Sequence, residues 1–199
     1  MPSPRGNLTW TPATAPPELL AKPVAAAIDT VPGALVAPID AELADTEAFC
    51  RAYDVALGAS ANCVIVAGQR AGTVKYAAVM VLATTRADIN NVVRRHLDVR
   101  KISFAPHQDA VELTGMEFGG ITPVGLPAGW PVLVDTQVAA CPEAVIGSGI
   151  RGSKLLVSGA ALAALPGAEV LDLPRCRREQ ASGGPRRPLR SRARRRDPA

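Results

Sequence analysis

Two long apolar runs, separated by a short segment with a glycine at each end, constrain this chain more than any other feature. Residues 61–67 and 73–83 are rich in β-branched and small apolar side chains, and Gly68 and Gly72 bound the segment between them. This pattern predicts two strands joined by a hairpin turn. Both runs are almost continuously apolar, which indicates strands buried on both faces or lining a closed sheet. Aromatic residues make up only 4% of the chain, so the core must consist mainly of Ala, Val, Leu and Ile.

Helical and extended patterns alternate along the rest of the chain. N-cap residues and glycine stops place the helices, and short apolar runs place the strands. The mixture lacks a regular βαβ repeat, so it predicts an α+β fold with a mixed, barrel-like sheet. We expect helices over 18–28, 45–57, 85–97 and 106–115 and after Ser158, and further strands over 34–39, 99–104, 132–135, 144–147, 153–157 and 170–173.

The chain divides into three parts by composition. Residues 1–17 hold five prolines and predict a flexible or extended lead-in. Residues 18–173 form the predicted domain, a length typical of a single core. Residues 174–199 carry ten arginines against two acidic residues, a net charge of +8, and predict a disordered Arg-rich tail. The tail is either an electrostatic arm for RNA or an extension without selected function.

Composition and spacing exclude several classes of protein. The longest apolar run, 77–83, is far short of the roughly 20 residues that cross a bilayer. No apolar segment follows Arg5, so no signal peptide is expected. The four cysteines include no C-x-x-C pair, and His96 and His107 form no H-x-x-x-H pattern, which argues against a zinc site. We therefore predict a cytoplasmic protein that has no membrane segment, no metal and no cofactor.

Familiar catalytic motifs are also missing. Ser148 lies between two glycines but lacks the G-x-S-x-G spacing, and the sequence has neither a phosphate-binding loop nor a dinucleotide fingerprint. We interpret His96 as a solvated helix end and His107 as a structural residue at a helix start. No serine or cysteine nucleophile with an evident partner emerges.

The most informative segment is the glycine- and proline-rich stretch over 112–127. Its glycines would let the backbone approach a ligand closely, and Pro123 would stiffen the end of the loop. Backbone N–H groups in such a loop can hold a carbonyl oxygen or a ribose hydroxyl. The alternative is a plain glycine-rich surface turn.

Four features over about 58–173 resemble one known family. They are the G-x-x-x-P loop at 119–123, a strand ending in Asp135, the turn Gly-Ser-Gly-Ile-Arg-Gly at 147–152, and the order Ala87-Asp88, Val92, Lys101, Thr114-Gly115. Together they are similar to the YbaK/EbsC family of free-standing aminoacyl-tRNA editing domains, related to the editing insertion of bacterial prolyl-tRNA synthetase.

The resemblance implies a mixed sheet surrounded by helices and an aminoacyl-tRNA deacylase. Family members hydrolyse the ester of a mischarged tRNA, here of the Cys-tRNA(Pro) or Ala-tRNA(Pro) type, in a backbone-lined pocket with help from the substrate. The implied partners are aminoacyl-tRNA and an aminoacyl-tRNA synthetase. The implied catalytic positions are Gly119, Gly120, Thr122 and Pro123, and the implied substrate-binding positions are Asn62, Asp135, Ser148, Gly149 and Arg151.

Two positions depart from the family pattern. Asn62 stands where family members have a lysine, and Lys154 stands where they often have an acidic residue. If the two positions face one pocket, Lys154 supplies the missing ammonium and joins the catalytic set. Otherwise it is an ordinary surface lysine. Strand alternation places Lys154 and Leu156 on the face opposite Leu155.

Three functional hypotheses follow. The first is an editing deacylase, and the second is a module of the same fold that binds aminoacyl-tRNA or a small ligand with its chemistry weakened. The third is a nucleic-acid-binding protein that acts through its tail. A basic cluster at Arg94, Arg95, Arg100 and Lys101 is either a patch for the tRNA backbone or a solvated helix end paired with Asp98.

Overall fold

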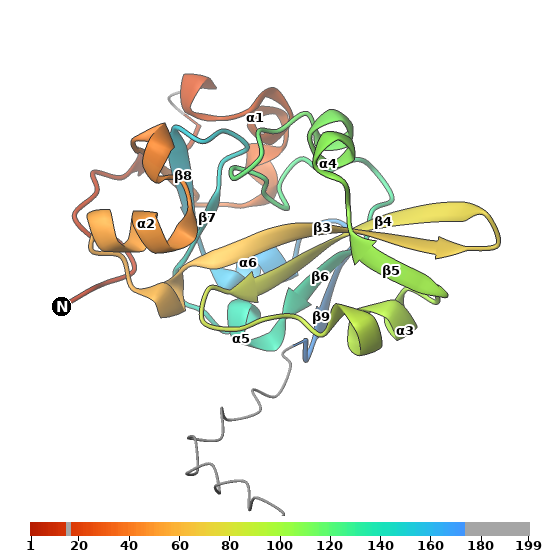
Figure 1. The fold of residues 1–199 in the computed structure, drawn as a ribbon. Helices are drawn as coiled ribbons and strands as arrows, with labels where there is room; N and C mark the ends of the chain where they lie inside the picture. The colour runs from red at the N-terminus through yellow and green to blue at the C-terminus, as the bar shows by residue number, and fades with distance from the viewer. Residues whose placement is uncertain (15–16, 174–199) are drawn as a thin grey trace, which may run out of the picture.

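The strands of this protein form two sheets that share one core. A computed structural model describes residues 1–14 and 17–173, and the predicted Arg-rich tail lies outside the described residues (Figure 1). One sheet has the strand order β1-β2-β8-β7 and the other β5-β3-β4-β6-β9. The strands are β1 Thr11–Pro12, β2 Leu35–Pro38, β3 Ala61–Arg70, β4 Thr73–Leu82, β5 Lys101–Phe104, β6 Val132–Asp135, β7 Ala144–Gly147, β8 Ser153–Val157 and β9 Ala168–Leu171. The helices are α1 Lys22–Ala27, α2 Thr46–Ala52, a π-helical turn Ile89–Val93 that continues into α3 Arg94–His96, α4 His107–Thr114, α5 Thr136–Ala139 and α6 Gly159–Ala163, with short 3-10 turns between them.

The predicted hairpin is the longest feature of the larger sheet. β3 and β4 pair antiparallel along their whole length, from Ala61 opposite Leu82 to Arg70 opposite Thr73. The turn is only two residues long, and both of its residues have positive φ. Gly68, expected in the turn, lies inside β3, where an added Cβ would come within 2.8 Å of the Val99 methyl groups.

The larger sheet is mixed. β5 pairs antiparallel with β3, while β6 runs parallel to β4 and β9 parallel to β6. The smaller sheet is antiparallel throughout. A bridge between Ser60 and Val145 connects the start of β3 to β7. The predicted α+β fold with a mixed sheet is confirmed, although within the described residues the strands form two open sheets and no closed barrel.

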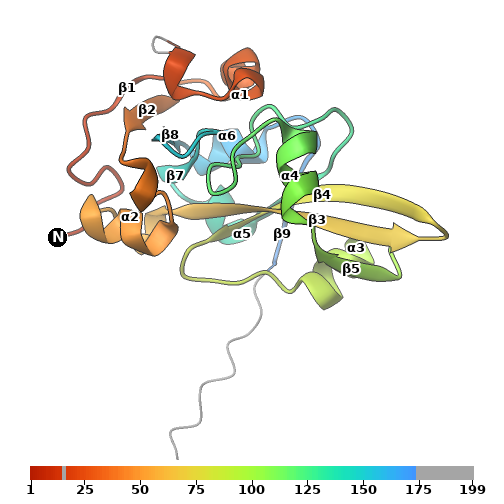
Figure 2. The same cartoon turned by 45° about the horizontal axis from the view of Figure 1, so that its top comes forward.

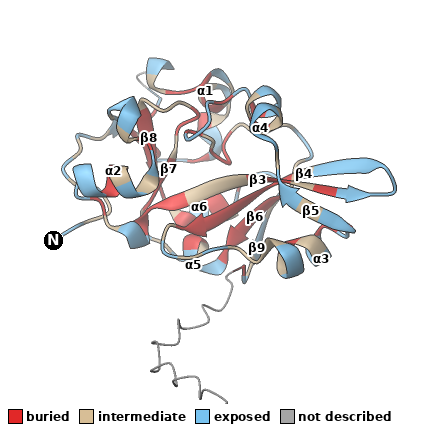
Figure 3. Ribbon diagram, in the orientation of Figure 1, coloured by how far each residue is buried: buried red, intermediate tan, exposed pale blue. Residues whose placement is uncertain are grey.

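Apolar side chains pack on both faces of the larger sheet. Figure 3 shows β6 and most of β4 as buried. On one face Ile65 and Met80 pack with Leu155 of the smaller sheet in the main core. On the other face Val79 and other strand residues pack with Leu97 beside α3 in a second core. This two-sided burial explains why both hairpin runs are almost continuously apolar.

The N-terminal segment packs on the body of the molecule. Thr11 and Pro12 pair with β2, Ala13 is buried, and Ser3 bridges to Val55. The segment expected to be a flexible or extended lead-in makes these contacts over its described residues. None of the helices in the described ranges is long and apolar enough to cross a membrane.

Candidate functional site

A cavity of about 590 Å³ lies where the two sheets approach each other. One wall comes from the start of β3, residues 62–65, and another from the end of β7, residues 145–147. The segment before α2, the start of α4 and the loop after it complete the lining. Segments distant in sequence thus meet around one apolar space. The polar, thiol and aromatic residues of its lining include Asp45, Thr46, Asn62, Cys63, Phe104, His107, Phe118 and Lys154.

The loop after α4 is held by its own backbone. Gly120 N–H donates to Glu117 O at 2.9 Å, and Gly149 N–H donates to Gly120 O at 2.8 Å. An added Cβ at Gly120 would lie 2.5 Å from Ile150 O, so only glycine fits there.

This arrangement leaves hydrogen-bond donors at the cavity. The N–H groups of Phe118, Gly119 and Ile121 have no acceptor among the described residues, and these residues line the cavity. Unpartnered amides of this kind can bind a carbonyl oxygen or an oxyanion.

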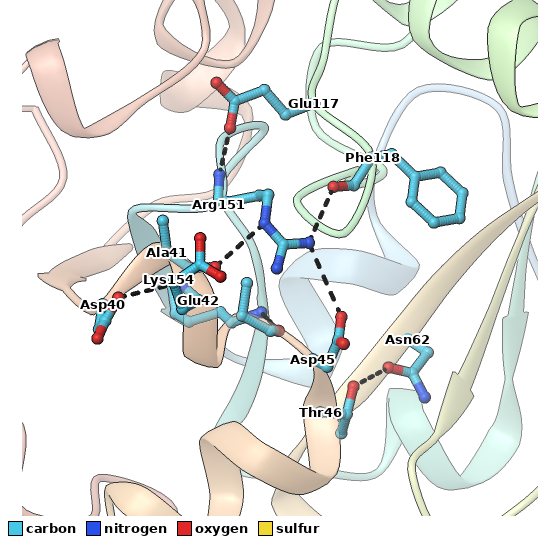
Figure 4. Close-up of polar contacts among 11 residues, drawn as sticks. Asp40, Ala41, Glu42, Asp45, Thr46, Asn62, Glu117, Phe118, Arg151 and Lys154 are labelled. Carbon is cyan, nitrogen blue, oxygen red and sulfur yellow. Dashed lines mark hydrogen bonds and ion pairs between the residues drawn. The ribbon is translucent and has the colours of Figure 1, made fainter.

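Arg151 connects this loop to the segment before α2 (Figure 4). Its backbone N–H donates to Glu117 Oε2 at 2.7 Å, and its guanidinium donates to Phe118 O at 3.4 Å and to Ala41 O at 3.1 Å. Asp45 Oδ1 lies 3.8 Å from the same guanidinium. These contacts give Arg151 a positioning role between two walls of the cavity.

Lys154 of β8 brings a buried ammonium to the cavity. The residue is 7% exposed, its Nζ donates to Ala44 O at 2.9 Å, and Nζ lies 5.2 Å from the centre of the Phe49 ring. The pKa of Lys154 is lowered to about 8, mainly by burial and in smaller part by nearby Arg151, whereas Cys50 and Asp45 oppose the shift. The ammonium is therefore mostly charged at pH 7. An ammonium has three N–H donors, so two remain for a ligand.

Asn62 lies close to Lys154, with the segment at 44–46 between them (Figure 4). Its Oδ1 accepts a hydrogen bond of 2.6 Å from Thr46 Oγ1. The Asn62 amide nitrogen has no acceptor among the described residues. Both departures from the family pattern thus line one cavity.

Aromatic side chains form the rim of the cavity. Phe104 and Phe118 are 61% and 55% exposed, and the His107 ring lies 4.3 Å from the Phe118 ring, centre to centre. His107, interpreted from sequence as structural, begins α4 and lines the cavity. Burial raises the pKa of the neighbouring Cys63 thiol to about 12, so this cysteine is not a thiolate nucleophile.

The remaining predicted site residues lie elsewhere. Ser148 and Gly149 are buried behind the loop, where Ser148 Oγ accepts a hydrogen bond from Ser153 Oγ at 2.6 Å. Thr122 is fully buried and Pro123 lines a separate groove beside Trp130.

Asp135 also lies away from the cavity, at the end of β6. Its Oδ1 accepts a 3.4 Å hydrogen bond from Leu173 N–H, and burial raises the pKa of its carboxyl. The residue expected to bind substrate therefore holds the last described residue of the chain. No group of three or more His, Cys, Asp or Glu side chains within the described ranges could hold a metal ion.

Comparisons with known proteins agree with this geometry. A family model described as the aminoacyl-tRNA editing domain matches residues 40–165, a range that contains every residue lining the cavity. No curated protein matches the chain. A solved structure described as a candidate trans-editing enzyme for prolyl-tRNA synthetase has a TM-score of 0.67 and 23% identity, and the match covers 78% of this chain and 97% of that one. A hypothetical protein of known structure has a TM-score of 0.59 and 25% identity, with 69% and 86% covered.

Proposed function

Because the chain belongs to the aminoacyl-tRNA editing domain family, we propose that its cavity hydrolyses the ester bond of a mischarged aminoacyl-tRNA. One observation carries the proposal: three loop residues whose N–H groups have no acceptor among the described residues line the same cavity as Lys154. Both kinds of donor stabilise the negative charge that develops on an ester oxygen under attack.

The reaction needs no protein nucleophile. A water molecule attacks the ester carbonyl, and the C–O bond to the ribose then breaks. The ribose oxygen takes up a proton that the water gives up, and the products are a free amino acid and a tRNA with its terminal hydroxyl restored. We propose that the neighbouring ribose hydroxyl or the substrate's own side chain assists this transfer. The neutral Cys63 thiol is compatible with such a mechanism.

The apolar lining suits a small, uncharged amino acid. Ala61, Ile65, Ala110 and Ile146 line the cavity, so a methyl or thiol group would leave no buried polar partner unsatisfied there. This chemistry supports alanine or cysteine as the amino acid removed, and we propose tRNA(Pro) as the tRNA that carries it. We propose the cytoplasm as the location and a synthetase that releases the mischarged tRNA as a further partner.

The experiment is deacylation of Ala-, Cys- and Ser-charged tRNA(Pro) by the native protein, Lys154→Met and Asn62→Lys. We expect hydrolysis by the native protein and a fall in kcat of about a hundredfold in Lys154→Met, the size typical of losing one oxyanion donor. The exposed Lys22→Met serves as the control, because it removes a lysine outside the cavity. A gain of turnover in Asn62→Lys would show a weakened hydrolase. Binding of aminoacyl-tRNA with no hydrolysis by any of the proteins would overturn the proposal in favour of a binding module.

A further inference from the structure

Charge is divided sharply within the described part of the chain. Residues 69–104 carry seven basic and two acidic side chains, a net of +5. The rest of residues 1–173 carries five basic and fourteen acidic side chains, a net of −9. A polyanion is therefore attracted to one segment and repelled by the remainder.

The basic segment also forms one region in space. The far end of the β3–β4 hairpin, α3 and β5 lie together at one end of the molecule in both views (Figures 1 and 2). We call this region the basic lobe and define it by Arg70, Lys75, Arg94, Arg95, Arg100 and Lys101.

Most cations of the basic lobe have no internal partner. Asp98 forms an ion pair with Arg70. It is therefore not the partner of Arg94 and Arg95, as the alternative of a helix end paired with Asp98 supposed. Lys75, Arg95 and Lys101 are exposed and form no ion pair with any described residue, and the same holds for Arg100. The lobe therefore presents to solvent free cations that can bind phosphate groups.

A groove runs from the cavity toward the basic lobe, and its residue Asn90 accepts a hydrogen bond of 2.7 Å from the Arg94 guanidinium of the lobe through its carbonyl oxygen. This groove, of about 470 Å³, shares Asn62, Val64 and Phe104 with the cavity and continues past Arg86 to Asn90 in the π-helical turn. An exposed aromatic ring beside an arginine is a typical surface for single-stranded nucleic acid, because bases stack on the ring and the cation holds a phosphate.

We propose that the groove binds the unpaired 3′ end of tRNA and that the basic lobe binds the backbone of the acceptor stem. This inference rests on the proposed function, since it places the ester in the cavity. Along β3 the eight steps from Asn62 to Arg70 span about 26 Å. A substrate held in the cavity must therefore extend over several nucleotides before it reaches the lobe.

The test compares two double variants of the full chain. Arg95→Gln with Lys101→Gln removes two free cations of the lobe, and Lys22→Gln with Arg51→Gln removes two exposed cations outside it. We expect the lobe variant to raise KM for Ala-tRNA(Pro) about tenfold at low salt. The slope of the logarithm of the binding constant against the logarithm of the salt concentration should also become shallower, by the equivalent of about two phosphate contacts. The control should change KM less than twofold. On an aminoacylated oligonucleotide too short to form a stem, the two variants should act alike.

Equal effects of the two variants on KM would overturn the inference. If the native protein hydrolyses no aminoacyl-tRNA, the proposed function fails, and binding of uncharged tRNA by the same variants still decides the role of the lobe. Weaker binding in the lobe variant alone supports the inference, and equal binding overturns it. Equal displacement by duplex DNA would also overturn it, because the lobe would then be a general polyanion surface.

Discussion

Lys154 is a charged residue in a place where charge is costly. The side chain is almost closed to solvent and keeps one hydrogen bond, to Ala44 O. Removing an ammonium from water favours its neutral form, which is why the pKa falls to about 8. An uncharged side chain of similar length would avoid this cost, so the lysine is better explained by its action in the cavity than by stability.

Lys154→Met should therefore be less active and more stable at neutral pH. Between pH 8 and 10.5 the unfolded chain holds the Lys154 proton and the folded protein does not, so native stability rises with pH in this window. We expect Lys154→Met to exceed the native free energy of unfolding by about 3 kcal/mol at pH 7, and the difference to vanish near pH 10.5. Urea unfolding of both proteins at pH 7 and pH 10.5 measures it. A variant that is less stable at pH 7 would show that the contacts of Lys154 with Ala44 and Phe49 stabilise the fold by more than the burial of its charge costs.

At the scale of elements, the loop after α4 depends on Gly120, whose surroundings differ from those of Gly152 in the turn between β7 and β8. Gly120 packs against the backbone at Ile150, whereas an added Cβ at Gly152 would meet nothing within 4 Å. The close packing at Gly120 positions the loop amides that line the cavity.

Gly120→Ala should accordingly lower both stability and hydrolysis. The added methyl group must displace backbone, which costs about 2 kcal/mol, and the loop donors would move from their positions. Gly152→Ala is the matched control and should change the free energy of unfolding by less than about 0.5 kcal/mol. Thermal unfolding and deacylation of both variants measure the contrast. Equal losses in the two variants would contradict a special role for the packing at Gly120.

Local signals predicted most elements, and packing between distant segments decided the exceptions. Ser158 caps α6 through its bond to Ala161 N–H, and Gly115 ends α4 with positive φ, both as expected. The helix expected over 85–97 begins later, as a π-helical turn whose N–H at Asn91 bonds to Asp88. The four residues of α5 are too few to show a helical period, so no pattern in the sequence predicted this helix.

In the candidate site, too, local signals predicted some residues, whereas packing between distant segments decided the others. Gly119 was predicted because the loop motif is local, and Lys154 because it departs from the family pattern just after the Gly-rich turn. Thr46, His107 and Phe118 come from separate segments that meet only in the folded chain. A single sequence contains no signal for that meeting. The resemblance to the family also led to the prediction of Asp135 as a site residue, but this residue ends β6 and lies away from the cavity.

For the whole molecule, the second core attaches the basic lobe to the larger sheet. Leu173 is fully buried in it with Val93 and Leu97, and its carbonyl accepts a hydrogen bond from Asp88 N–H at 2.8 Å. We propose that residues 18–173 form one folded unit. The contacts of Leu173, the last described residue, thus support the segment that carries the free cations.

Leu173→Ala should destabilise the protein by about 3 kcal/mol, the usual cost of emptying a buried leucine site. Val170→Ala at the same end is the control, because Val170 is 45% exposed and should lose less than about 1 kcal/mol. Hydrogen exchange of the amides in α3 and β5 adds a local readout, which we expect to accelerate in Leu173→Ala only. Unchanged exchange there would show that the lobe is held without Leu173.

The division of charge within residues 1–173, between the basic lobe and the acidic remainder, also gives this part of the protein a permanent electric dipole. Such a dipole turns the molecule in the field of an approaching polyanion before any contact forms, so a larger fraction of collisions begins with the lobe in front. The benefit falls on the association rate, which should drop steeply as ionic strength rises, while dissociation changes far less. For the editing activity that we propose, which must find rare mischarged molecules among many correct ones, rapid and oriented sampling of tRNA matters more than tight binding.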